Sequence, residues 1–246
     1  ANNGRLTRVE VATGDVFTVR PTPRAGEAEY RFEWVTPSLI SQHDPLSVYF
    51  GGNRLFMSHD RGLTWEHTDD LTKSINPASL TIMGVPYSTP SCSAGGGGGG
   101  GGAAQAPPRP RTGPCILSKG DGINSFSQIT TIAESPLDRN ILWVGVDDGN
   151  VQVSRAGGKT WTEVSRNIRG VPALSRVSRV TASTSGPGVA YVTYDNHHQG
   201  DFAPYVFRTR DFGATWEPLV NGLPSGSVNV IKEHPRNANL LFVGTE

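Results

Sequence analysis

The chain has 246 residues, with 22 Lys or Arg and 22 Asp or Glu, so its formal net charge is zero. A balanced charge argues against a nucleic-acid-binding protein, which needs a basic surface. The sequence also contains no run of 18 apolar residues that would span a membrane as a helix. Thirty Gly, 18 Pro and short apolar runs instead favour an all-β repeat protein with many turns.

Strands are predicted in chain order wherever short apolar or alternating runs are bounded by turn residues. The clearest unit has strands at 129–132, 141–146, 151–153 and 161–164. Complete four-strand units of this kind are predicted over 30–71, 128–166 and 175–221, and half units over 1–21 and 227–246. The first 20 residues lack the basic start and apolar core of a signal peptide.

An eight-residue pattern, Ser/Thr-x-Asp-x-Gly-x-Thr-Trp, occurs three times, between the third and fourth strands of each complete unit. Its residues are Ser58, Asp60, Gly62 and Trp65, then Ser154, Gly158 and Trp161, then Thr209, Asp211, Gly213 and Trp216. The middle copy has Ala156 where the others have Asp. We expect the Asp to accept hydrogen bonds from backbone N–H groups one to three residues on, and the Gly to adopt an angle that other residues resist. The Trp is expected to start the next strand and to bury its ring against the turn.

This pattern resembles the Asp-box, or bacterial neuraminidase repeat, of sialidases, sortilin-type receptors and xyloglucanase-type glycoside hydrolases. Those proteins are β-propellers, so the resemblance implies four-stranded antiparallel blades with Asp-box turns. Residues 132–149 and 230–246 also resemble large bacterial exported proteins with sortilin-like repeats. That resemblance implies a secreted or periplasmic protein whose remaining blades lie on a longer chain. The two half blades leave two alternatives, a fragment of a larger propeller, which we prefer, and a small four-bladed ring.

The repeats are not evenly spaced, because 96 residues separate Trp65 from Trp161 and only 55 separate Trp161 from Trp216. A repeat of about 40–50 residues therefore predicts a Gly- and Pro-rich insertion at 72–127. It contains eight consecutive glycines at 95–102, whose origin the sequence leaves open. Cys92 and Cys115 flank the glycines, and a disulfide and two free thiols remain equal alternatives.

The residues that close the second strand of successive units are predicted to be neighbours around one rim of the propeller. They are Asn53, Asp147 with Asp148, Asp195, and Glu246. Because loops of a four-stranded meander alternate between faces, the insertion and the 196–203 loop are expected on this same face. Ligands of such folds bind where loops converge.

Glycoside hydrolysis needs two carboxylates on either side of the bond that is cut. The candidate catalytic residues are Asp147 with a partner from Asp148, Asp195 or Glu246. Asp147 begins a short match to the Asp-x-Gly-Gly hairpin of xyloglucanase-type hydrolases, in which an Asp is catalytic, but Asn150 replaces the second Gly. The alternative is that Asp147 is an ordinary hairpin residue.

Other chemistry finds less support in the sequence. His197, His198 and Asp201 are better explained as a solvated loop than as a metal site. No metal or cofactor is therefore expected. The sequence predicts a propeller that binds a carbohydrate or peptide ligand without turning it over, with a glycoside hydrolase as the alternative.

Overall fold

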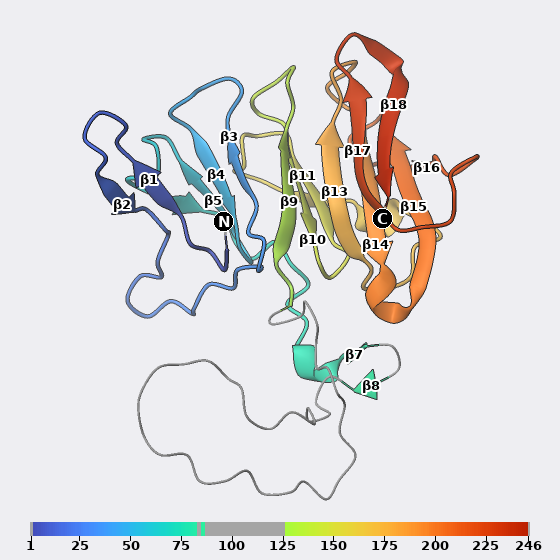
Figure 1. Ribbon diagram of the computed structural model, residues 1–246, viewed down its shortest axis with the longest axis horizontal. Helices are drawn as coiled ribbons and strands as arrows, with labels where there is room; N and C mark the ends of the chain where they lie inside the picture. The colour runs from blue at the N-terminus through green and yellow to red at the C-terminus, as the bar shows by residue number, and fades with distance from the viewer. Residues whose placement is uncertain (1, 83–84, 87–125, 246) are drawn as a thin grey trace, which may run out of the picture.

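The computed structural model describes residues 2–82, 85–86 and 126–245, and these form an all-β protein (Figure 1). The described residues contain no α-helix and three short 3-10 turns, at Pro77–Ser79, Ser165–Asn167 and His197–Gln199. Their strands form three four-stranded antiparallel sheets, a two-stranded sheet before and after these, and a short hairpin in the insertion. The fold is an arc of a β-propeller, as the sequence predicts.

Each blade is a meander in which strand order follows chain order. The first complete blade consists of β3 (Ser38–Ile40), β4 (Val48–Gly51), β5 (Leu55–Ser58) and β6 (Glu66–His67). The second consists of β9 (Ile129–Glu134), β10 (Leu142–Val146), β11 (Val151–Ser154) and β12 (Thr162–Glu163). The third consists of β13 (Arg176–Ala182), β14 (Ala190–Asn196), β15 (Asp201–Thr209) and β16 (Glu217–Pro218).

The remaining strands come in pairs. They are β1 (Thr7–Val9) with β2 (Val16–Thr18), β7 (Thr81–Ile82) with β8 (Val85–Pro86), and β17 (Val228–His234) with β18 (Asn237–Thr245). The first strands of successive blades, β3, β9, β13 and β17, contact one another in turn. The pairs β1–β2 and β17–β18 lie at opposite ends of the arc and form separate sheets (Figure 1). They do not complete one blade, so the four-bladed ring is wrong for this structure.

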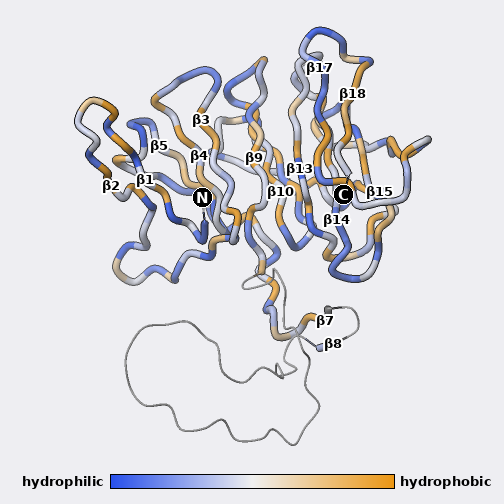
Figure 2. The backbone as a smooth tube through the Cα atoms, viewed as in Figure 1, coloured by the Kyte–Doolittle hydropathy of each residue, from blue (hydrophilic) through white to orange (hydrophobic). Residues whose placement is uncertain are grey.

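The core lies between adjacent blades, where the second strands of the second and third blades are buried along their whole length. Every residue of β10 and β14 is buried, because both faces of each strand pack on neighbouring sheets. Trp143 in β10 is fully buried, and its ring meets that of Trp216 edge-on at 6.2 Å. Figure 2 shows apolar residues along the strands of the blades and mainly hydrophilic residues at the β3–β4 and β17–β18 turns. Burial of these apolar strands is the main force that holds blade to blade.

Two strand boundaries differ from the sequence prediction. The expected loop at 196–203 is half strand, because β14 ends at Asn196 and β15 begins at Asp201, which leaves only residues 197–200 between them. The turn-forming residues at 234–239 likewise leave only a short turn, because β17 ends at His234 and β18 begins at Asn237. In both hairpins the backbone ladder extends across polar residues that composition alone assigns to turns.

The three repeated turns are built by side-chain hydrogen bonds to the backbone. In the first, the Asp60 carboxylate accepts from the N–H groups of Leu63 and Thr64, each at 2.9 Å, and from the Thr64 hydroxyl at 2.6 Å. The Ser58 hydroxyl accepts from Gly62 N–H at 2.7 Å. The Asp thus caps N–H groups three and four residues on, rather than one to three as expected.

Backbone angles explain why the middle turn folds without an Asp. Gly62, Gly158 and Gly213 have φ values of 85°, 88° and 84°, which confirms the conformation predicted for the Gly. The residue before each is also left-handed, and in the middle turn it is Gly157. A glycine adopts that angle without strain, so the turn closes with Ser154 accepting from Gly158 N–H at 2.9 Å and no carboxylate.

The three tryptophans are less buried than the sequence suggests. Trp65, Trp161 and Trp216 are each half-buried and precede the outer strand by one residue. Trp161 contacts its own turn, donating from Nε1 to Gly158 O at 2.9 Å. Trp65 donates instead to Val19 O in the preceding half blade, at 2.8 Å. The rings therefore link the turns to neighbouring structure while one side stays in water.

At two of the junctions between adjacent blades, a buried glutamate of one blade accepts hydrogen bonds from the other. Glu233 at the end of β17 accepts from the hydroxyls of Ser183 (2.6 Å), Thr184 (2.6 Å) and Tyr191 (2.8 Å) in the third blade. Glu134 at the end of β9 makes the same kind of contact with the first blade, to Ser41 Oγ at 2.8 Å. These hydrogen bonds connect the two neighbouring sheets at each of these two junctions.

We expect Glu233→Ala to lower the free energy of unfolding by about 2–3 kcal/mol at pH 7, because it leaves several buried donors unpaired. Although burial raises it, the hydrogen bonds from Ser183, Thr184 and Tyr191 hold the pKa of Glu233 below its usual value of 4.5. The stabilisation is therefore present above pH 4.5 and is lost as the pH falls through the lowered folded-state pKa.

Urea unfolding of the wild type and Glu233→Ala at pH 7 and pH 3 measures this difference, with the exposed Glu66→Ala as control. A Glu233→Ala protein as stable as the control variant at pH 7 would contradict a role for Glu233 between the blades.

Candidate functional site

A cavity of about 360 Å³ opens at the rim where β10 and β14 end and β13 begins, and we call it the rim pocket. It is lined by Ser79, Leu80, Thr81, Phe126, Asp147, Pro172, Ala173, Leu174, Arg176, Asp195, Asn196, His198 and Gln199. The start of the insertion forms one wall, and Gln199 Nε2 donates to Thr81 O at 2.7 Å. The described start of the insertion, with β7, and the β14–β15 turn lie on the same face of the propeller (Figure 1).

Asp147 lines the rim pocket, but one of its oxygens is committed to the backbone. Its Oδ1 accepts from Gln128 N–H at 2.8 Å, and its own N–H donates to Gln128 O at 3.0 Å. The residue is only 5% exposed. Burial raises the pKa of Asp147 to about 7, although the Gln128 N–H and the charge of Arg176 oppose the shift.

The first blade makes the same contact with an amide in place of the acid. Asn53 Oδ1 accepts from Arg31 N–H at 3.1 Å, and Asn53 N–H donates to Arg31 O at 2.9 Å. An amide oxygen can accept this hydrogen bond in place of a carboxylate oxygen. The contact of Asp147 with Gln128 is thus part of the blade framework and does not itself require an acid.

Asp148 is the turn-forming carboxylate of the 147–149 hairpin. It accepts from the N–H groups of Lys73 at 2.7 Å and Asn150 at 3.1 Å. It is fully buried, and burial raises its pKa despite these hydrogen bonds. Asp148 does not line the rim pocket.

Asp195 is the second carboxylate in the rim pocket, and both of its oxygens have a partner. Oδ1 accepts from His197 N–H at 3.0 Å, and Oδ2 lies 2.6 Å from His197 Nδ1. Burial acts to raise the pKa of Asp195, but the His197 hydrogen bonds outweigh it and leave the pKa below its usual value. One pocket therefore contains a carboxyl that titrates near neutrality and a carboxylate that stays ionised.

An ion pair that the sequence does not reveal lies beside these acids. Arg176 Nη1 lies 2.9 Å from Glu33 Oε1, and Glu33 is buried. Because 143 residues separate the two, no local motif signals the pair. It ties the segment before β3 to the start of β13 and places one guanidinium in the pocket wall.

The other predicted site residues fall elsewhere. Glu246, Cys92, Cys115 and the glycines at 95–102 lie outside the described residues. Asp60 and Asp211 hold turns at the opposite ends of the strands from the rim pocket. Within the part of the chain that the structure describes, no group of three or more His, Cys, Asp or Glu is arranged to hold a metal ion.

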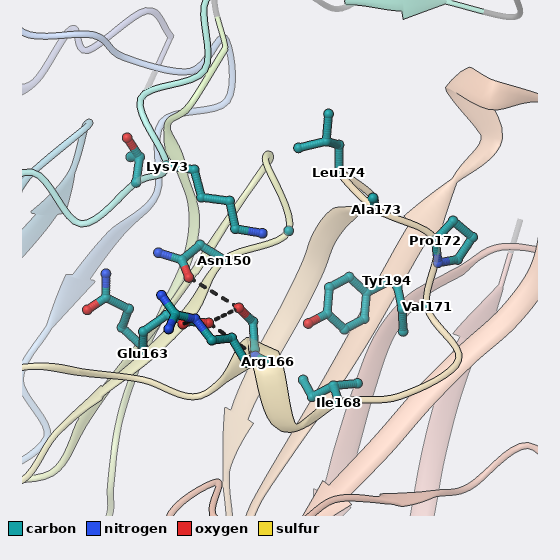
Figure 3. Close-up of a pocket in the computed structure, with 14 residues that line it drawn as sticks. Lys73, Asn150, Glu163, Arg166, Ile168, Val171, Pro172, Ala173, Leu174 and Tyr194 are labelled. Carbon is teal, nitrogen blue, oxygen red and sulfur yellow. Dashed lines mark hydrogen bonds and ion pairs between the residues drawn. The ribbon is translucent and has the colours of Figure 1, made fainter.

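A larger cavity of about 600 Å³ adjoins the rim pocket and shares Pro172, Ala173 and Leu174 with it (Figure 3). We call it the side pocket. Leu174 has a φ of 63°, a left-handed angle that is unusual for a branched side chain. This strained segment forms the ridge between the two pockets.

The fold and the rim pocket define a β-propeller segment with a ligand-sized, acid-lined cavity at its rim. No family model matches the chain. It is 30% identical over 94 residues to an oligoxyloglucan-reducing end-specific xyloglucanase of Emericella nidulans, a match covering 36% of this chain and 10% of that protein.

Solved structures give a similar result. An ancestral GH74 enzyme superposes with a TM-score of 0.51 at 12% identity, covering 87% of this chain and 22% of that one. YCF48 bound to D1 peptide gives a TM-score of 0.42 at 14% identity, covering 81% and 47%. The chain thus spans about a tenth of the curated relative and about a fifth of the GH74 enzyme. No helix among the described residues is long and apolar enough to cross a membrane.

Proposed function

We propose that this chain is part of a secreted or periplasmic Asp-box propeller that binds carbohydrate in the rim pocket without turning it over. The observation that carries the proposal is that both acids already make hydrogen bonds within the protein. Asp147 holds Gln128 N–H as Asn53 holds Arg31 N–H, and both oxygens of Asp195 contact His197. What remains open to a ligand is a pocket with fixed polar groups and an apolar side.

Carbohydrate is favoured over peptide by two features. The xyloglucanase of Emericella nidulans acts on a glycan, and its likeness to this chain extends over 94 residues. The rim pocket also mixes polar groups (Asp147, Asn196) with an apolar surface (Phe126, Leu174). Such a mixture suits the hydroxyls and the C–H faces of a sugar ring.

A blocking variant tests this proposal. Ala173 is exposed in the wall of both pockets, so Ala173→Trp should fill the entrance without disturbing the core. We expect the wild type to bind at least one neutral polysaccharide on a glycan array, and Ala173→Trp to lose at least tenfold in affinity. Ala214→Trp is the matched control, because Ala214 is equally exposed in a turn at the opposite ends of the strands. Absence of binding to every saccharide offered would end this proposal.

A glycoside hydrolase is the second candidate, favoured by the split protonation of the two acids. A carboxyl with a pKa of about 7 is suited to act as a general acid, and the ionised Asp195 would serve as its partner. Release of reducing ends from xyloglucan and β-glucan measures this activity. The hydrolase predicts turnover that falls at least 100-fold in Asp147→Asn, whereas equal turnover in that variant would eliminate the site.

A further inference from the structure

The side pocket contains polar groups that the proposed function of the rim pocket does not use. It lies between the second and third blades and is lined by Lys73, Gln152, Glu163, Arg166 and Tyr194, among others. Figure 3 shows the Lys73 ammonium and the Tyr194 hydroxyl pointing toward the middle of the pocket. Its donors and acceptors differ in how far they are already satisfied.

Most hydrogen-bond acceptors of the side pocket already accept hydrogen bonds from neighbouring residues. Glu163 accepts from the Ser165 hydroxyl, from Arg166 N–H at 3.1 Å and from the Arg166 guanidinium. Asn150 Oδ1 accepts from Ser165 Oγ at 3.3 Å, and Asn150 Nδ2 donates to Leu71 O at 2.7 Å. A ligand therefore finds few acceptors here for its own hydroxyl groups.

The donors, in contrast, keep free capacity. Lys73 Nζ donates one hydrogen bond, to Asp148 O at 3.2 Å, which leaves two of its three N–H groups. Arg166 uses its Nε on Glu163, and its side chain is otherwise exposed.

Tyr194 is the unpartnered polar group of this pocket. The residue is only 2% exposed, its ring packs on Phe207 at 6.3 Å, and no described residue hydrogen-bonds its hydroxyl. Burial and then the charge of Glu163 raise the pKa of Tyr194, so the hydroxyl remains a donor at physiological pH. Because no described protein group occupies this hydroxyl and the residue lines the pocket, the hydroxyl is available to a ligand or to water.

The opposite side of the pocket is apolar and includes Ile168, Val171, Pro172 and Leu174. Free donors that converge beside an apolar wall suit a compact ligand with a carboxylate on one edge. We propose that the side pocket binds the carboxylate of a uronic acid residue through Lys73 and Tyr194, as part of a glycan whose next residues occupy the rim pocket. This inference rests on the proposed function. Because the two pockets share the ridge at 172–174, a single glycan chain could occupy both.

Calorimetry with an oligogalacturonate and its methyl-esterified, neutral counterpart tests the inference. We expect the wild type to prefer the acidic form by tenfold or more at low salt. Lys73→Met and Tyr194→Phe should each remove most of that preference by lowering the affinity for the acidic form more than the affinity for the neutral form. Lys159→Met is the matched control, because Lys159 is exposed in the 154–161 turn away from both pockets. Tyr194→Phe removes an unpartnered hydroxyl, so its melting temperature should match the wild type.

The outcomes separate this inference from the proposed function. Binding of both saccharides with a preference that survives Lys73→Met and Tyr194→Phe would overturn the inference and leave carbohydrate binding in place. Binding of neither saccharide would reject the proposed function and, with it, the inference. A poly-glutamate peptide that binds through Lys73 and Tyr194 when the oligogalacturonate does not would show that the carboxylate belongs to a protein.

Discussion

Asp147→Asn should raise the free energy of unfolding by about 2–4 kcal/mol at pH 8 and change it little at pH 3.5. Burial raises the folded-state pKa of Asp147 from 3.8 to about 7, so the folded protein holds a proton that the unfolded chain releases. Each unit of that difference corresponds to about 1.4 kcal/mol. The contribution of Asp147 to the free energy of unfolding of the wild type is therefore most favourable below pH 3.8. It becomes less favourable as the pH rises and is least favourable above pH 7.

The Asn variant removes this cost because it has no charge to bury. Its side-chain oxygen still accepts from Gln128 N–H, as Asn53 does from Arg31 N–H in the first blade. Thermal melts of both proteins between pH 3.5 and pH 8 measure the difference.

Asp195→Asn is the matched control, and its expected sign is opposite. The pKa of Asp195 is lowered by its contacts with His197, so the ionised group stabilises the fold at neutral pH and the Asn variant loses stability there. If Asp147→Asn showed the same pH profile as the wild type, Asp147 would not be a buried carboxyl that titrates near neutrality. That result would also weaken the hydrolase alternative, which needs Asp147 protonated near neutrality.

The fold could be predicted because its signals are local. Each repeated turn needs a Gly with positive φ and a Ser or Thr that caps its N–H, and both are visible in eight residues. Strand lengths were harder to predict from the sequence, because polar residues such as Asp201 and Asn237 join a ladder only when a partner strand lies beside them. The extent to which the three tryptophans are buried likewise depends on the position of the neighbouring blade, which the eight-residue pattern does not contain.

The rim could be predicted in part. Alternation of loops between faces places Asp147 and Asp195 at one end of the blades, and the structure shows them in one cavity. The sequence cannot show that Lys73 and Tyr194 meet in the side pocket, because 121 residues separate them and no motif contains both. Arg176 and Glu33 were missed for the same reason.

The two glutamates that join adjacent blades could have been predicted from a pattern in the sequence. Glu134 and Glu233 occupy the same position in the two echoing segments 132–149 and 230–246, just before a residue that precedes Pro. Their partners Tyr49 and Tyr191 occupy one position in the second strand, opposite Leu39 and Thr181. Between the second and third blades, Trp143 stands at the tyrosine position and Ala182 at the glutamate position. The larger ring fills the space that a tyrosine and a glutamate share elsewhere.

Gly213→Ala should lower the free energy of unfolding by about 3–5 kcal/mol, which combines two costs. Gly213 has a φ of 84°, where a residue with a Cβ costs about 1–2 kcal/mol. A Cβ there would also lie 2.7 Å from Val164 Cβ in the preceding blade. Val164 is buried and β-branched, so it cannot rotate away, and overpacking adds about 1–3 kcal/mol.

Gly222→Ala separates the two costs, because Gly222 has a φ of 79° but no atom lies within 4 Å of the place that its Cβ would take. We expect it to cost only about 1–2 kcal/mol in urea unfolding, the backbone part alone. A double variant, Gly213→Ala with Val164→Ala, should be more stable than the sum of the single effects by about 1 kcal/mol or more, since the clash is relieved. Equal destabilisation by Gly213→Ala and Gly222→Ala would show that the third turn does not pack against the second blade. The placement of the third blade beside the second would then be contradicted at this contact.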